Sequence, residues 1–93
     1  MNGNRDFVVR LLAKYWTANP LACDTPDGIC RWWLSSDRVG MDSLLAALAW
    51  MKERGLVDEL TAADGRTRYR RSASDDRLSD VVRDGEAYPA GKH

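Results

Sequence analysis

The stretch "MDSLLAALAWMKERGLVDELTAADGRTRYRR", residues 41–71, decides the fold. Its first half has apolar residues at helical spacing, which predicts a helix over Met41–Arg54. Gly55 follows at the position where a glycine commonly ends a helix. The predicted inner stripe of this helix consists of Met41, Leu44, Leu45, Leu48 and Met51, and the opposite side carries Ser43, Ala46 and Trp50.

Beyond this glycine the spacing changes to that of a β-hairpin. The runs "LVDEL" and "RTRYRR" are separated by "TAADG", whose Asp-Gly pair is a strong hairpin signal. In the second run Thr67 and Tyr69 fall on one face, and the arginines at even positions fall on the other. Four of the chain's fourteen basic residues lie within six positions there: Arg66, Arg68, Arg70 and Arg71.

These arginines have two interpretations. An exposed strand at the edge of a sheet often carries charge, which prevents it from pairing with the edge of another molecule. Lysines or mixed charges would serve that purpose equally well, yet no acid lies between Arg66 and Arg71. Guanidinium groups bind phosphates through charge-assisted, often bidentate hydrogen bonds. We therefore expect the row to contact an anion.

Upstream, a first helix is predicted from Arg5 to the segment "TANP", residues 17–20. It ends there because the residue before Pro20 is pushed out of the helical region of backbone conformations. A short extended piece, "LAC", follows. The apolar residues that recur on one side of the first helix are Phe7, Val8, Leu11, Leu12 and Tyr15.

A second helix of about nine residues is predicted to begin after Thr25, a good N-cap, with Pro26 in its first turn. The segment "SSDRVG", residues 35–40, ends it as a turn. Neighbouring residues on a helix point in different directions, so one of Trp32 and Trp33 is expected near the surface or a dimer contact. The residues expected on its inner side are Ile29, Cys30 and Trp33.

Length and composition predict one cytoplasmic domain. At 93 residues the chain cannot divide its core between two folding units, and neither a secretion signal nor a membrane span is expected. Cys23 and Cys30 are expected to be free thiols. The net charge is zero, because a slightly basic segment over residues 1–74 is offset by an acidic one over residues 75–93. That second segment predicts a short helix, with Leu78, Val81 and Val82 on one face and Gly85 as its stop, followed by a tail.

Catalytic chemistry is not indicated. The only histidine is the terminal His93, and the chain has no paired carboxylates, metal-binding cluster or phosphate-binding glycine loop. We therefore expect no enzymatic activity, no metal and no cofactor. Nothing in the sequence points to a particular small-molecule effector.

The order helix, short strand, helix, turn, helix and basic hairpin resembles the winged-helix family of DNA-binding domains, and is most similar to the core of MarR-type bacterial transcriptional regulators. The resemblance covers most of residues 5–72 and rests on "DTPDGICRWWL", "MDSLLAALAWMKERGLV" and "DELTAADGRTRYRR". It implies a mainly α fold with a small β-hairpin: a three-helix core plus a two- or three-stranded antiparallel wing. This winged-helix domain would span residues 1–74, and residues 75–93 would form a short C-terminal helix and a tail.

The resemblance also implies a regulator that binds double-stranded DNA. Its third helix would lie toward the major groove, and the wing arginines would reach the phosphate backbone or the minor groove. The DNA-binding residues implied are Arg66, Arg68, Arg70 and Arg71 on the wing and Ser36, Arg38 and Ser43 near the start of the third helix.

A homodimer is expected, because two DNA half-sites would then be bound together. Trp16 and Trp50 are the large apolar side chains expected at the dimer interface. The alternative is a winged-helix module that binds a protein through the side of the third helix that carries Ala46 and Trp50. The residues there favour this alternative, because Asp42, Ala46 and Ala47 offer little that could read bases.

Overall fold

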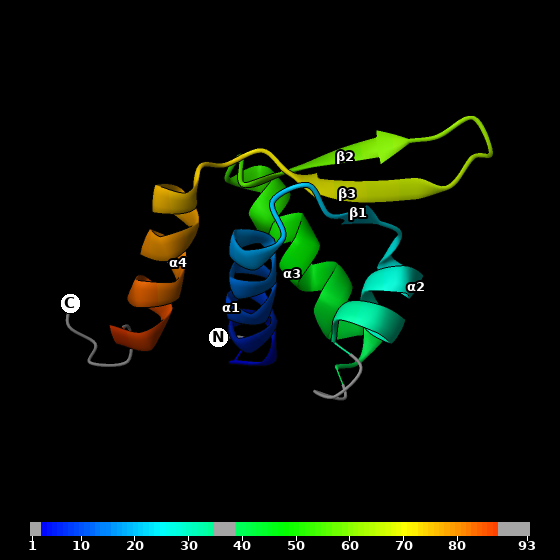
Figure 1. The fold of residues 1–93 in the computed structure, drawn as a ribbon. Coiled ribbons are helices and arrows are strands. Elements are labelled where there is room, and N and C mark those ends of the chain that lie inside the picture. The colour runs from blue at the N-terminus through cyan, green and yellow to red at the C-terminus, as the bar shows by residue number, and fades with distance from the viewer. Residues whose placement is uncertain (1–2, 35–38, 88–93) are drawn as a thin grey trace.

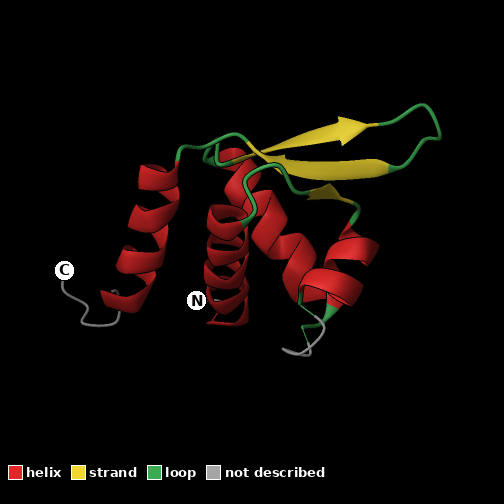
Figure 2. Ribbon diagram, in the orientation of Figure 1, coloured by secondary structure: helices red, strands yellow, loops and turns green. Residues whose placement is uncertain are grey.

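A computed structural model describes residues 3–34 and 39–87 of the chain, with side chains for residues 4–34 and 39–82. The fold is mainly helical with a small three-stranded antiparallel sheet, as expected (Figures 1 and 2). The elements are α1 (Gly3–Ala18), β1 (Cys23–Asp24), α2 (Pro26–Gly28) continuing into the π-helical η1 (Ile29–Trp33), α3 (Met41–Glu53), β2 (Val57–Thr61), β3 (Thr67–Arg71) and α4 (Asp75–Ala87).

The strand β3 lies in the middle of the sheet, between β1 and β2. The short β1 pairs with its end, with Cys23 opposite Arg70. The hairpin of β2 and β3 extends beyond the helices on the side where α2 lies, whereas α4 lies at the opposite end of the molecule (Figure 1). The tip of the hairpin is therefore the part of the sheet that is free to meet another molecule.

Local signals end and turn the chain as the sequence predicts. The Thr25 hydroxyl accepts a hydrogen bond from the Gly28 N–H at 3.1 Å, which caps α2. Gly55, with φ of +72°, follows α3, and the Leu56 N–H donates to the Met51 carbonyl in the manner of a Schellman motif. Gly65, with φ of +81°, turns the hairpin. A side chain at either glycine would strain the backbone.

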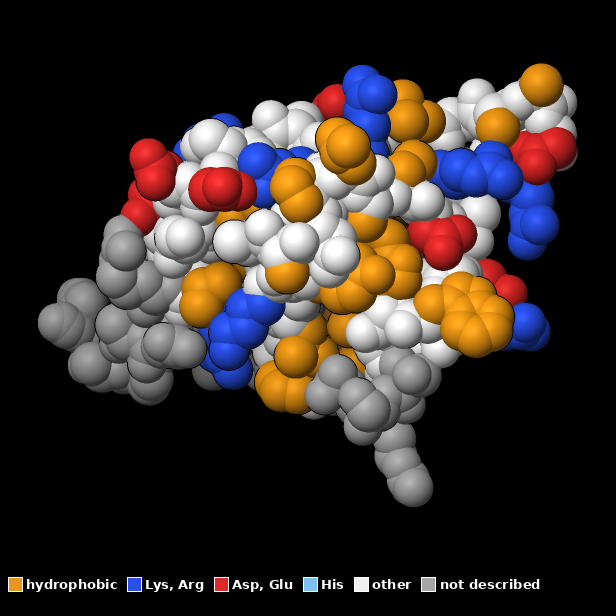
Figure 3. Space-filling view, viewed as in Figure 1, with side chains coloured by type: hydrophobic (Ala, Val, Ile, Leu, Met, Phe, Trp, Pro, Cys, Tyr) orange, Lys and Arg blue, Asp and Glu red, His pale blue; other side chains and the backbone are white. Residues whose placement is uncertain are grey.

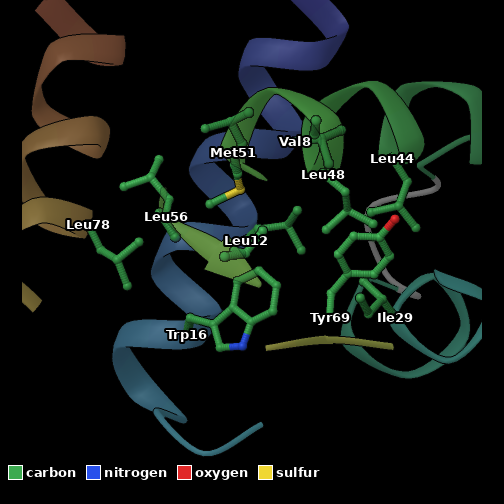
Figure 4. Close-up of a cluster of buried hydrophobic side chains, with 14 of the residues drawn as sticks. Val8, Leu12, Trp16, Ile29, Leu44, Leu48, Met51, Leu56, Tyr69 and Leu78 are labelled. Atoms are coloured by element: carbon green, nitrogen blue, oxygen red, sulfur yellow. The ribbon is translucent and has the colours of Figure 1, made fainter. Parts of the chain in front are cut away.

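The core lies where α1, the second helix, α3 and α4 meet the inner face of the sheet, and Trp16 is its largest fully buried side chain (Figure 4). The exposed fraction of Trp16 is 0%, and its indole N–H donates to the Ala22 carbonyl at 2.9 Å. Its ring meets Trp33 edge to face at 5.0 Å between centroids. The prediction that Trp16 lies at a dimer interface is therefore wrong, because both its apolar surface and its polar atom are already used inside the monomer.

The buried stripe of α3 is rotated from the predicted one. Leu44, Leu48 and Met51 are buried as expected, but Met41 and Leu45 keep 36% and 43% of their surface exposed. Ala47, which the helical spacing places on the outer side, has an exposed fraction of 0%. Ala47 belongs to the core cluster, where its small side chain lets neighbouring elements pack closely against α3.

The helix α4 belongs to the same core as the preceding elements. Leu78 is fully buried, and Val81 and Val82 pack against the core as predicted, because α4 lies along α1. The predicted boundary between residues 1–74 and residues 75–93 therefore does not separate two hydrophobic cores. Gly85 does not end the helix, which continues to Ala87. A glycine inside a helix costs only about 1 kcal/mol, so it does not by itself stop one.

The two tryptophans Trp16 and Trp32 provide a matched test of this core. We expect Trp16→Ala to lower the free energy of unfolding by about 3–5 kcal/mol, because a large buried ring leaves a cavity. At a protein concentration low enough to keep the chain monomeric, Trp32→Ala should change it by no more than about 0.5 kcal/mol, because Trp32 is 74% exposed. Urea unfolding of both variants, with Trp16→Phe as a milder replacement, measures the difference. Equal losses for Trp16→Ala and Trp32→Ala would contradict this view of the core.

Candidate nucleic-acid interface

The outer face of the hairpin carries two of the predicted arginines. Directly paired residues share a face of a sheet, and Arg70 is paired with Asp58 while Arg68 is paired with Leu60. Tyr69, between the two arginines, is buried on the inner face. The predicted separation of arginines from the packed side is thus confirmed for Arg68 and Arg70.

Arg66 lies in the turn and not in the strand. Its N–H donates to Asp64 Oδ1 at 2.9 Å, and its carbonyl accepts from the Ala62 N–H at 2.9 Å. Its side chain is exposed. Arg66 therefore stands beside the tip of the hairpin, the part of the sheet farthest from the helices.

Acidic residues accompany the two outer arginines. Asp64 Oδ2 lies 3.5 Å from Arg68 Nη2, and Asp58 Oδ2 lies 3.6 Å from Arg70 Nε. Basic and acidic side chains consequently alternate at the hairpin end of the molecule (Figure 3). The segment from Arg66 to Arg71 contains no acid and so gives no sign of these pairs, because the acids come from the partner strand and from the turn.

Arg71 has a structural role that strand periodicity does not reveal. It lies on the inner face, where its side chain is only 17% exposed, opposite the buried Val57. Its Nη1 donates to the Trp16 carbonyl at 3.2 Å and pairs with the Asp75 carboxylate at the start of α4. This guanidinium ties the sheet to α1 and α4, so only a small part of Arg71 remains available for the predicted contact with DNA.

A second polar network links the hairpin to the end of α3. Glu59 accepts a hydrogen bond from Lys52 Nζ at 2.6 Å and another from the Tyr69 hydroxyl at 2.8 Å. These two donors, Lys52 first, hold the pKa of Glu59 below its ordinary value. Burial, and then the Glu59 carboxylate, raise the pKa of Tyr69 to about 12. The network joins both strands of the hairpin to the end of α3.

The outer side of α3 offers few groups that could read base edges. Its exposed polar residues are Asp42, Lys52 and Glu53, and Lys52 is engaged by Glu59. Ser43 is half-buried in the first turn. The other two residues predicted near this helix, Ser36 and Arg38, lie outside the described residues.

Trp50 is half-buried and is covered by two guanidinium groups. The Cζ atom of Arg54 lies 4.3 Å from the centre of the Trp50 ring, and that of Arg5 lies 5.5 Å from it. Trp32, by contrast, is 74% exposed, while Trp33 stacks on Tyr15 with 4.3 Å between ring centroids. The prediction that one of the adjacent tryptophans reaches the surface is confirmed, and that residue is Trp32.

Comparisons with known proteins identify no relative of this chain, so a function has to be inferred from the geometry described above. No protein-family model matches the chain, and neither a curated protein nor a solved structure is significantly similar to it. Among the residues that the structure describes, no three or more histidine, cysteine, aspartate or glutamate side chains are grouped to hold a metal ion. Both cysteines are free thiols, as predicted.

No helix in the described part of the chain combines the length and the apolar character needed to cross a membrane.

The network around Tyr69 predicts a pH dependence of stability. The pKa of Tyr69 is raised from 10.0 to about 12 in the folded state, so the unfolded chain loses this proton first as pH rises. The stability that depends on the neutral phenol is therefore present below pH 10 and is lost as pH rises toward 12. We expect the difference in unfolding free energy between the parent and Tyr69→Phe to change across this window, as measured by urea unfolding at each pH.

The matched control is Glu59→Gln, which keeps an oxygen that can accept the phenol proton but removes the negative charge. The pKa of Tyr69 is then raised less, so the alkaline loss of stability becomes smaller. Parallel pH profiles for the parent and Tyr69→Phe would show that the phenol is not held in the neutral form.

Proposed function

We propose that this chain is a winged-helix protein, closest to the core of MarR-type regulators, that binds double-stranded DNA and regulates transcription. The observation that carries the proposal is an arginine-bearing hairpin that extends from a helical core, with Arg66 at its tip and Arg68 and Arg70 on its outer face. The order of elements and the strand order β1-β3-β2 support the winged-helix assignment, because a short strand before the second helix joins the hairpin as a third strand.

Phosphate contacts would supply most of the affinity. Guanidinium groups on a projecting hairpin reach a duplex without requiring the helical core to approach it. Four arginines against three acids over residues 57–71 leave this segment only slightly basic. Because α3 offers few base-reading groups, the proposed binding depends strongly on salt and weakly on base sequence.

A homodimer is part of the proposal. Trp16 is enclosed in the core, and the half-buried Trp50 has the guanidinium groups of Arg5 and Arg54 over its ring, so Trp50 offers less apolar surface than an exposed tryptophan. Trp32 is the tryptophan whose ring remains largely exposed. It is therefore the aromatic side chain that gains most from burial against a second copy.

The second candidate function is a winged-helix module that binds a protein partner. It is favoured by the aspartates that already pair with Arg68 and Arg70, and by exposed apolar side chains such as Leu45 at the side of α3. On this alternative the arginines keep the hairpin soluble and do not bind phosphate.

Salt-dependent binding to a random-sequence duplex, measured by fluorescence anisotropy, separates the two candidates. If the wing binds phosphates, Arg66→Ala should make the slope of log K against log salt shallower by about one unit. Arg68→Ala and Arg70→Ala should change the slope in the same direction. Lys14→Ala is the matched control, because it removes one exposed positive charge from α1, away from the hairpin tip.

The parent and Lys14→Ala are expected to give equal slopes. Absence of binding at low salt, or an equal response to all four substitutions, would contradict the DNA proposal and leave the protein-binding module as the better candidate.

Light scattering tests the dimer. The expected mass of the parent is twice the 10.5 kDa of the chain. Trp32→Ala should shift it toward the monomer, and Trp50→Ala should leave it nearly unchanged because that ring is already covered. A monomeric parent at high micromolar concentration would remove the dimer from the proposal.

A further inference from the structure

We propose that Asp58 and Asp64 act as built-in substitutes for phosphate, which occupy Arg70 and Arg68 and so set the DNA affinity of the hairpin. This inference rests on the proposed function and adds two residues that lower the affinity of the hairpin for DNA. A phosphate would have to displace a carboxylate from each of these guanidinium groups before binding.

The pair of Asp58 and Arg70 is built into the register of the sheet. The two residues lie directly opposite each other on the outer face, with Arg70 Nε 3.6 Å from Asp58 Oδ2. Their side chains are 48% and 56% exposed, so water and ions reach both. An exposed pair of this kind contributes little to stability, which means that a stronger anion can replace the carboxylate.

Asp64 has two roles, carried by different oxygen atoms. Its Oδ1 accepts the Arg66 N–H at 2.9 Å and so supports the turn, whereas its Oδ2 lies 3.5 Å from Arg68 Nη2. The Arg66 N–H is the main reason that the pKa of this carboxyl lies below its ordinary value, so Asp64 stays charged at neutral pH. An asparagine could still accept the N–H and keep the turn while losing the charge.

Arg66 provides the contrast within the same hairpin. Among the described residues it takes part in no ion pair, although it lies close enough to Asp64 to help lower the pKa of that carboxyl. A phosphate can therefore reach Arg66 without breaking a pair. The three outward arginines are thus unequal, with Arg66 available first and Arg68 and Arg70 held by carboxylates.

The expected size of the effect follows from the exposure of these pairs. Displacing an aspartate releases a guanidinium but leaves a negative charge within several ångströms of the bound phosphate. In water-exposed surroundings this cost is modest, so each aspartate should weaken binding by roughly three- to tenfold and should not abolish it. The displaced carboxylate also takes up a cation, which offsets part of the counterion release.

The experiment compares Asp58→Asn and Asp64→Asn with the parent by fluorescence anisotropy on the same random-sequence duplex across a salt series. Each variant should bind about three- to tenfold more tightly at low salt, with a slope steeper by up to about one unit. The matched control is Asp76→Asn, which makes the same change in net charge at an exposed position on α4. A gain limited to the hairpin variants shows that position, and not total charge, is responsible.

A double substitution tests the pairing itself. In an Arg70→Ala background, Asp58→Asn should lose most of its gain, because no guanidinium remains to be released. The same holds for Asp64→Asn in an Arg68→Ala background. A gain that persists in full without the arginine overturns the proposal, because the aspartate would then act only by repelling DNA.

The outcomes separate this inference from the proposed function. If the parent binds duplex and the hairpin variants match Asp76→Asn, the inference is wrong and the DNA function stands. If the parent fails to bind at low salt but Asp58→Asn or Asp64→Asn binds, the DNA function of the natural chain is wrong, whereas the inference that these aspartates keep phosphate from the arginines is supported. If no variant binds at low salt, both are overturned together. Far-ultraviolet circular dichroism confirms that each variant has the fold of the parent.

Discussion

The burial of Trp16 is the constraint on which the rest of the structure depends. Its ring is the largest fully buried side chain of the core, and its indole N–H donates to the Ala22 carbonyl, which brings the chain into β1. Its edge meets Trp33, which positions the helix that α2 begins. Its carbonyl accepts the Arg71 guanidinium, which in turn pairs with Asp75. One residue near the end of α1 thereby connects the sheet, the second helix and α4.

The charges of the hairpin follow from how this core holds the sheet. Because Tyr69 and Arg71 face inward, the even-numbered positions of β3 face outward and carry Arg68 and Arg70. The same antiparallel register brings Asp58 beside Arg70. A surface that is basic when the strand is considered alone becomes a surface of alternating charge. This is why both a DNA-binding wing and a solubilising edge are reasonable interpretations of the same residues, and why neutralising single aspartates is informative.

Much of the fold could be predicted from the sequence because its signals are local. A hydroxyl at Thr25, a glycine after the helix at Gly55 and an Asp-Gly turn at Gly65 act on neighbouring backbone groups, whatever the rest of the chain does. The candidate site was less predictable. The identity of the outer arginines followed from strand periodicity, but their partners lie on another strand or in the turn, so no pattern within "RTRYRR" could reveal them.

The sequence by itself determined the order of the helices and strands, most of their limits, and which side chains alternate along β3, because these depend on local backbone preferences and on residue spacing. Only the tertiary structure decided that Trp16 is enclosed, that Ala47 rather than Leu45 faces the core, and that Arg71 supports α4 instead of facing solvent. Each of these outcomes depends on how one element packs against another. Several apolar side chains could be buried in one core. Which of them are buried depends on the distances and angles between elements, and no single segment of the sequence specifies these.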